Sequence, residues 1–191
     1  MSQKPKTRKR RAPRKISQRY LENAGLYYLE RYSSTSANFR RVMRRKITRS
    51  AKHHENNPEE IEEFHSILED IILRYQSSGL LNDPLYAFSK VRSLRAKGNS
   101  ARMIQSKLFQ KGLKPEQIDA AMQEYRDDQD ANGREIERQA AEKYARKKRL
   151  GPHRIPPDPE RYQKDMASMA RAGFSYDTVK SVLDLNDMES E

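Results

Sequence analysis

The sequence predicts an all-α protein of three tandem three-helix repeats, and three observations lead to this prediction. A helical phrase occurs three times, each copy opening with a hydroxyl residue that can cap a helix and continuing with apolar residues at helical spacing. Apolar and charged residues each make up 35% of the chain, which suits several small cores better than one deep core. No stretch alternates with the period of two that marks a β-strand. Because repeats stack along one direction, we expect an elongated molecule that binds something long.

The three copies of the phrase define the expected core. They open at Thr35, Ser100 and Ser175. Their apolar positions are Phe39, Val42 and Met43 in the first copy, Ile104 and Leu108 in the second, and Val179, Val182 and Leu183 in the third. In the second copy Lys107 replaces one apolar residue. Since apolar residues at helical period usually face a core, we expect these side chains to be buried.

Breaks in the helical pattern divide the chain into four parts. Asn57-Pro58 and Asp83-Pro84 read as helix starts, and Gly79, Gly98, Gly112 and Gly173 read as helix ends. We expect helices at 17–32, 35–47, 58–75, 83–97, 100–111, 115–125 and 127–150, then one around Met166 and a last one at 175–185. The polar residues 50–57 and the proline-rich residues 151–159 are expected to be irregular. The predicted parts are a disordered basic arm (1–16) and three repeats (17–81, 82–126 and a looser 127–191).

The charge of the chain is strongly basic, with a formal net charge of +12. Residues 1–19 contain nine Lys or Arg residues and no acid, so most of the excess lies in the arm. Such a segment is attracted to polyanions, although it also serves as a solubilising tail. The chain has no Cys, no apolar run long enough for a membrane span and no secretory signal, so we expect a cytoplasmic protein. Nothing indicates a dimer seam, and we expect a monomer.

Two runs of cations beyond the arm are candidate contacts for DNA or for an acidic protein surface. They flank the apolar positions of the first two repeats with few acids between them, which is unusual for a merely solvated face. The candidates are Arg40, Arg41, Arg44, Arg45 and Lys46 in the first repeat, and Lys90, Arg92, Arg95, Lys97, Arg102, Lys107 and Lys111 in the second.

Catalytic and metal sites find little support. The four His residues lack the i,i+4 spacing of a zinc site, and no Gly-rich phosphate loop occurs, so we expect no metal, no cofactor and no enzymatic activity. The tyrosines leave two interpretations open. Tyr20, Tyr27, Tyr28 and Tyr32 could stack on nucleic-acid bases beside the basic arm, but packing of the first repeat is the simpler interpretation.

Four stretches of the chain together resemble the RecX family, the modulators of the bacterial recombinase RecA. They are residues 24–33 (AGLYYLERYS) continuing through Phe39 to Ile47, residues 79–83 (GLLND) with Tyr86-Ala87, residues 91–98 (VRSLRAKG) running through Ile104 and Leu108 to Leu113, and residues 171–177 (RAGFSYD). Each stretch alone is weak, but their order and spacing are specific. The resemblance covers roughly residues 20–185 and leaves out the basic arm.

The resemblance implies tandem three-helix repeats in a curved, elongated molecule. RecX-type proteins lie along the groove of the RecA filament on DNA and restrain its ATP hydrolysis and strand exchange, which would damp homologous recombination and the SOS response. A general nucleic-acid binder, for DNA or RNA, remains the alternative, since three-helix units also occur in helix-turn-helix proteins. A filament regulator prefers recombinase-coated DNA, whereas a phosphate binder prefers naked nucleic acid and shows a strong salt dependence.

Overall fold

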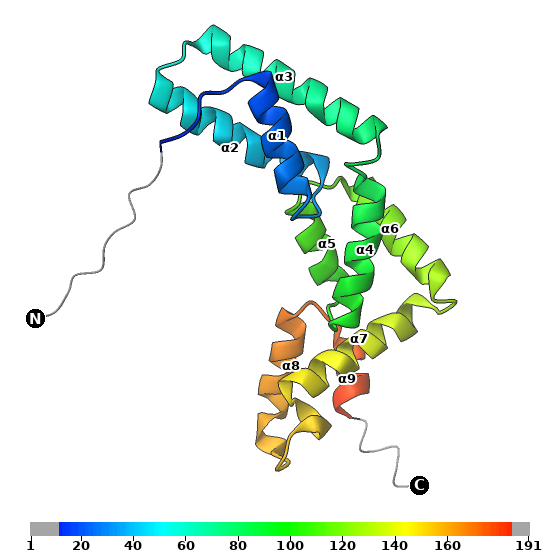
Figure 1. Ribbon diagram of the computed structural model, residues 1–191. Helices are drawn as coiled ribbons and strands as arrows, with labels where there is room; N and C mark the ends of the chain where they lie inside the picture. Colours follow the sequence, from blue (N-terminus) through cyan, green and yellow to red (C-terminus); the bar gives the residue numbers. More distant parts are fainter. Residues whose placement is uncertain (1–11, 185–191) are drawn as a thin grey trace, which may run out of the picture. The chain divides into compact units, whose positions relative to one another are not determined.

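Residues 12–184 are described by a computed structural model, and they form nine α-helices and two short 3₁₀ helices without a β-strand (Figure 1). The all-α prediction is confirmed. The α-helices are α1 (Gln18–Leu29), α2 (Ser36–His54), α3 (Pro58–Ser77), α4 (Asp83–Ala96), α5 (Ala101–Phe109), α6 (Pro115–Asp128), α7 (Gly133–Lys148), α8 (Tyr162–Arg171) and α9 (Tyr176–Leu183). The 3₁₀ helices η1 (Gly151–His153) and η2 (Pro159–Arg161) lie between α7 and α8.

The described chain divides after Leu81 into a first unit containing α1–α3 and a second unit containing α4–α9. The first unit is built on one apolar cluster that includes Leu21, Phe39 and Leu68. The second unit contains two clusters, one within α4–α6 around Ile104 and one within α7–α9 around Met169. All the apolar residues of the three phrases except the half-buried Val42 are buried, as expected.

The hydroxyl residue that opens each phrase caps a helix. The Oγ1 atom of Thr35 accepts a hydrogen bond from the backbone N–H of Asn38 at 3.0 Å, and Ser100 Oγ accepts one from the N–H of Met103 at 3.2 Å. Ser175 caps α9 in the same way. Each cap satisfies a backbone donor that the first helical turn leaves without a partner. The repeated phrase therefore corresponds to a repeated local structure.

Helix α2 continues through part of the segment 50–57, which we expected to be irregular. The helix extends to His54 because its last turns are covered: Ser50 is 1% exposed and Ala51 is 5% exposed. The covering chain is the end of the predicted basic arm, where Ile16 is 4% exposed within the first core. Residues 12–16 are therefore packed rather than disordered, and the remainder of the predicted arm, residues 1–11, lies outside the described residues.

A second difference concerns the helix expected at 127–150. The structure ends α6 at Asp128 and begins a new helix, α7, at Gly133. The reason is local, because Asn132 caps α7 by accepting a hydrogen bond from the N–H of Glu135 at 2.8 Å. Gly133 therefore opens a helix instead of weakening one.

Within the second unit, α7 packs directly against the turn between α4 and α5. Gly98 in this turn has φ +75°, and a Cβ atom placed there would lie 2.9 Å from the backbone nitrogen of Tyr144 and 3.0 Å from the carbonyl oxygen of Ala140. Only glycine allows this approach without a shift of the α7 backbone. The turn before α9 approaches α5 in a similar way, and Ser100 Oγ donates to the carbonyl oxygen of Ala172 at 2.6 Å.

A buried ion pair joins the same elements. The guanidinium of Arg95, a residue only 5% exposed, lies 2.6 Å from a carboxylate oxygen of Glu137 on α7. Both carboxylate oxygens of Glu137 also accept from the N–H of Ala101 at 3.2 Å, at the start of α5. Glu137 thus compensates one buried charge and one helix-end donor, so removal of Glu137 leaves the Arg95 charge without a counter-charge and the Ala101 N–H without this acceptor.

We expect Glu137→Ala to lower the free energy of unfolding by about 3 kcal/mol, because it leaves the Arg95 charge buried and unpaired. Urea unfolding followed by circular dichroism measures the loss. The control is Glu142→Ala on the same helix, whose ion pairs with Arg138 and Arg146 are more exposed and whose loss should be below about 1 kcal/mol. Equal losses in the two variants would contradict the prediction.

We expect Gly98→Ala to lower the melting temperature of the protein more than Gly79→Ala. Both glycines have positive φ, +75° and +76°, so both variants carry a backbone strain of about 1–2 kcal/mol. A Cβ at Gly79 would meet nothing within 4 Å, whereas a Cβ at Gly98 would press on α7. The additional loss at Gly98, about 1–3 kcal/mol for an overpacked contact, measures the close approach of α7. If the two variants have the same melting temperature, the close approach of α7 to Gly98 does not affect the cost of the substitution.

Candidate polyanion-binding surfaces

The five candidate cations on α2 do not form a uniform basic ridge. Arg40 makes a two-pronged contact with Glu69 on α3, with its Nε and Nη2 atoms 2.8 and 2.7 Å from the two carboxylate oxygens. Arg44 lies 3.3 Å from the same carboxylate. Hydrogen bonding by Arg40 holds the pKa of Glu69 below its ordinary value. Arg40 and Arg44 therefore share one acid that comes from the next helix of the chain.

The other α2 candidates lie closer to solvent. Arg41 and Arg45 are exposed, and Lys46 is half-buried. The guanidinium of Arg41 donates to the side-chain oxygen of Asn38 at 2.6 Å. The exposed positive charge of α2 thus comes mainly from Arg41, Arg44 and Arg45.

In the second unit, Arg95 must be removed from the list of candidate contacts. It is buried and paired with Glu137, because α7 covers the side of α4 on which it lies. Its role is structural. The remaining candidates are exposed or half-buried: Lys90, Arg92, Lys97, Arg102 and Lys111 are exposed and Lys107 is half-buried. The ammonium of Lys90 lies 5.7 Å from the ring centre of Tyr86.

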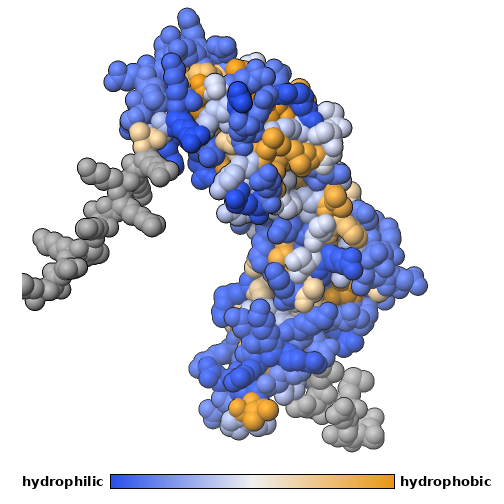
Figure 2. Space-filling view, viewed as in Figure 1, coloured by the Kyte–Doolittle hydropathy of each residue, from blue (hydrophilic) through white to orange (hydrophobic). Residues whose placement is uncertain are grey.

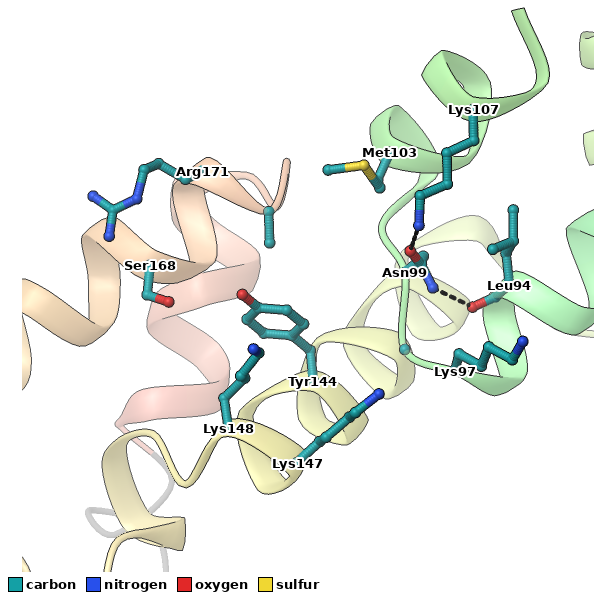
Figure 3. A pocket seen from close by; sticks show the side chains of 12 residues that line it. Leu94, Lys97, Asn99, Met103, Lys107, Tyr144, Lys147, Lys148, Ser168 and Arg171 are labelled. Carbon is teal, nitrogen blue, oxygen red and sulfur yellow. Dashed lines mark hydrogen bonds between the residues drawn. The ribbon is translucent and has the colours of Figure 1, made fainter. Parts of the chain in front are cut away.

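Two of these candidates, Lys97 and Lys107, lie in a pocket of about 590 Å³, which we call the unit-2 pocket (Figure 3). Three cations that the sequence did not single out complete it, namely Lys147 and Lys148 of α7 and Arg171 of α8. The lining contains no carboxylate. Among residues 12–184, no acid lies within ion-pair distance of any of the five cations.

The floor and walls of the unit-2 pocket come from four helices. Figure 3 shows side chains of α4 and α5 on one side, those of α8 on the other, and Tyr144 with Lys147 and Lys148 of α7 between them. Lys107 is oriented by a 2.6 Å hydrogen bond to the side-chain oxygen of Asn99, whose amide donates to the Leu94 carbonyl oxygen at 2.9 Å. Apolar side chains including Leu94 and Met103 contribute the rest of the lining.

The helix macrodipole explains why each of the five cations of the unit-2 pocket lies at the C-terminal end of its helix. Lys107, Lys147 and Lys148, and Arg171 lie in the last turns of α5, α7 and α8, and Lys97 is the C-terminal cap of α4. Cations are favoured at helix C-termini because the macrodipole is negative there. This local preference is visible in the sequence, but the meeting of the helix ends in one pocket requires the contact between α7 and Gly98. That is why Lys147, Lys148 and Arg171 were missed.

No group of three or more His, Asp or Glu residues within 12–184 could hold a metal ion. In the same part of the chain, no helix has both the length and the apolar character needed to cross a membrane. The surface is hydrophilic over most of the face in Figure 2, with small separate apolar areas. Within the described surface, the unit-2 pocket stands out because its lining has five cations and no carboxylate.

Similarity to known proteins identifies the family of this chain, which the geometry alone does not. Two family models match, "RecX, second three-helix domain" over residues 82–122 and "RecX, third three-helix domain" over residues 135–183. A "Regulatory protein RecX" of Myxococcus xanthus is 42% identical over 185 residues, 96% of this chain and 94% of that protein. A protein of the same name from Agrobacterium fabrum is 30% identical over 90% of this chain and 86% of its own length.

Solved structures agree on the fold. The crystal structure of RecX from Lactobacillus salivarius superposes with a TM-score of 0.62 at 22% identity, covering 88% of this chain and 97% of that one. A second crystal structure of a regulatory protein RecX gives a TM-score of 0.60 at 24% identity, over 87% of this chain and 71% of that chain. The matches over nearly the whole chain confirm the family suggested by the four sequence stretches, and the chain belongs to the RecX family of regulatory proteins.

Proposed function

We propose that the protein binds the filament that RecA forms on DNA and inhibits RecA ATP hydrolysis and strand exchange, thereby restraining recombination and the SOS response. The observation that carries this proposal is the 42% identity to a regulatory protein RecX over nearly the full length of both chains. RecX proteins are regulators and not enzymes, so the effect has to come from binding. We further propose that the protein acts in the cytoplasm as a monomer and uses its three repeats to contact successive parts of the filament.

Binding alone is sufficient for such an effect. A protein that binds one state of the filament more tightly than another shifts the filament toward the preferred state by its difference in affinity. The exposed cations of α2 and of the unit-2 pocket are suited to phosphates or to acidic side chains that the filament presents. Arg45, Lys147 and Lys148 are the residues that we propose for these contacts, because each is exposed and none has an acid within ion-pair distance among the described residues.

A second candidate function, general binding of DNA or RNA through phosphate, is favoured by the unit-2 pocket, which is cationic without any acid in its lining. The two functions predict different preferred ligands. A filament regulator binds recombinase-coated DNA more tightly than naked DNA, whereas a phosphate binder does the opposite.

We expect the protein to inhibit RecA ATP hydrolysis on single-stranded DNA at far less than one copy per recombinase. The measurement is a titration of the full chain and of a variant that lacks residues 1–11 into the reaction. The deletion stops at residue 11 because Ile16 belongs to the first core. Inhibition by both forms at low ratios supports the proposal. Inhibition only at ratios that coat the DNA, and only with residues 1–11 present, would favour the phosphate binder.

We expect the double variant Lys147→Glu/Lys148→Glu to bind recombinase-coated DNA more weakly, with the slope of log affinity against log salt reduced by about 2. The matched control is Lys164→Glu/Lys180→Glu, which makes the same change in net charge at exposed positions outside the pocket. If both double variants weaken binding to the same extent, net charge rather than the unit-2 pocket is responsible.

A further inference from the structure

A second basic cleft lies in the first unit, where residues 12–17 cross helix α2. Two hydrogen bonds hold the backbone of this segment in place. Ser50 Oγ donates to the carbonyl oxygen of Arg14 at 2.8 Å, and His54 Nε2 lies 3.1 Å from the carbonyl oxygen of Pro13, to which it donates when that nitrogen carries the proton. The side chain of Ile16 is 4% exposed in the first core and anchors the segment further.

Because the backbone is held on α2, the neighbouring basic side chains remain at the surface. Arg14 and Lys15 are exposed and line a cleft of about 790 Å³, together with Arg19 of α1 and Lys46 of α2. We call this the N-terminal cleft. Its lining contains no carboxylate, and within residues 12–184 none of the four cations has an acid within ion-pair distance. The amino-acid sequence continues the same charge, with six further Lys or Arg residues and no acid in residues 1–11.

Aromatic rings line the same cleft. Tyr20 and Tyr27 both come from α1, and Tyr27 is 60% exposed. The guanidinium carbon of Arg31 lies 3.6 Å from the ring centre of Tyr27, and Arg31 also donates to the Tyr27 carbonyl oxygen at 3.3 Å. Arg31 thus packs against the Tyr27 ring, which lines the cationic cleft. An exposed aromatic ring of this kind has no role in the core of the first unit.

We propose that the N-terminal cleft binds single-stranded nucleic acid, with phosphates along Arg14, Lys15, Arg19 and Lys46 and a base stacked on Tyr27. Proteins that bind single strands without sequence preference combine these two elements, a cationic groove for the backbone and aromatic rings for the bases. A duplex offers the same phosphates but keeps its base faces stacked, so the ring contributes only for an unpaired strand. An acidic peptide would use the cations but would not need the ring. This proposal does not depend on the regulation of RecA.

The test measures the affinity of the full-length protein for fluorescein-labelled oligothymidylate by fluorescence anisotropy, without recombinase. We expect Tyr27→Ala to weaken binding of the single strand about tenfold, as the loss of one stacked base does, and to leave the affinity for a duplex of equal length unchanged. Tyr27→Trp should keep or increase the affinity for the single strand. Tyr176→Ala, which removes a tyrosine of similar exposure (65%) in the second unit, should have no effect.

Charge is tested separately with Arg14→Glu/Lys15→Glu, which should lower the salt slope for single-stranded DNA by about 1.4, because each phosphate contact to a single strand contributes about 0.7. The proposal is overturned if Tyr27→Ala leaves single-strand affinity unchanged, or if it weakens single-strand and duplex binding equally. It is also overturned if polyglutamate competes with the oligonucleotide as well as unlabelled oligothymidylate does, because the cleft would then select charge alone. None of these outcomes bears on the inhibition of RecA ATP hydrolysis, so the two proposals can fail independently.

Discussion

At Gly98 the backbone of α7 comes so near that a single methyl group would collide with it, and the arrangement of the second unit depends on this contact. The approach brings Glu137 within reach of Arg95 and of the first N–H of α5. A charge buried in this way is stable only while its partner stays in place. Gly98 therefore permits the close approach of α7, and the Arg95–Glu137 ion pair holds α7 against the turn.

The same contact creates the unit-2 pocket. Each of its cations is favoured by the end of its own helix, where a positive charge meets the negative end of the macrodipole. Once α5, α7 and α8 converge, these separate local preferences produce a group of cations without a nearby acid. Like charges brought together repel, so the group stabilises a bound anion more than it stabilises the fold. On α2 the outcome is different, because Glu69 partly neutralises Arg40 and Arg44.

The two basic regions differ in how they are built. The unit-2 pocket combines cations with apolar side chains and is formed by four helices, α4, α5, α7 and α8, of one packed unit. The N-terminal cleft is formed by a segment held on α2 and has an exposed ring at its edge. A regulator that acts by binding needs no chemistry at either place. It needs surfaces whose charge matches the partner.

Local chemistry in the sequence determined much of this protein. The caps at Thr35, Ser100 and Ser175, the proline helix starts and the apolar spacing predicted the helical repeats, because these signals act within one or two helical turns. The four matched stretches indicated the family. The sequence pattern also named the α2 cations and two residues of the unit-2 pocket.

Only the tertiary structure decided which cations remain exposed and which are paired inside the fold. Arg95 and Lys97 are two residues apart on one helix end, yet one is buried against Glu137 and the other lines the unit-2 pocket. Likewise, the segment 12–16 reads as a free basic arm until Ser50 and Ile16 fix it on α2. Hydropathy and charge spacing describe a residue's own helix, whereas burial and ion pairing depend on helices that are distant in sequence. For that reason the fold could be predicted from the sequence, but the candidate binding surfaces could be predicted only in part.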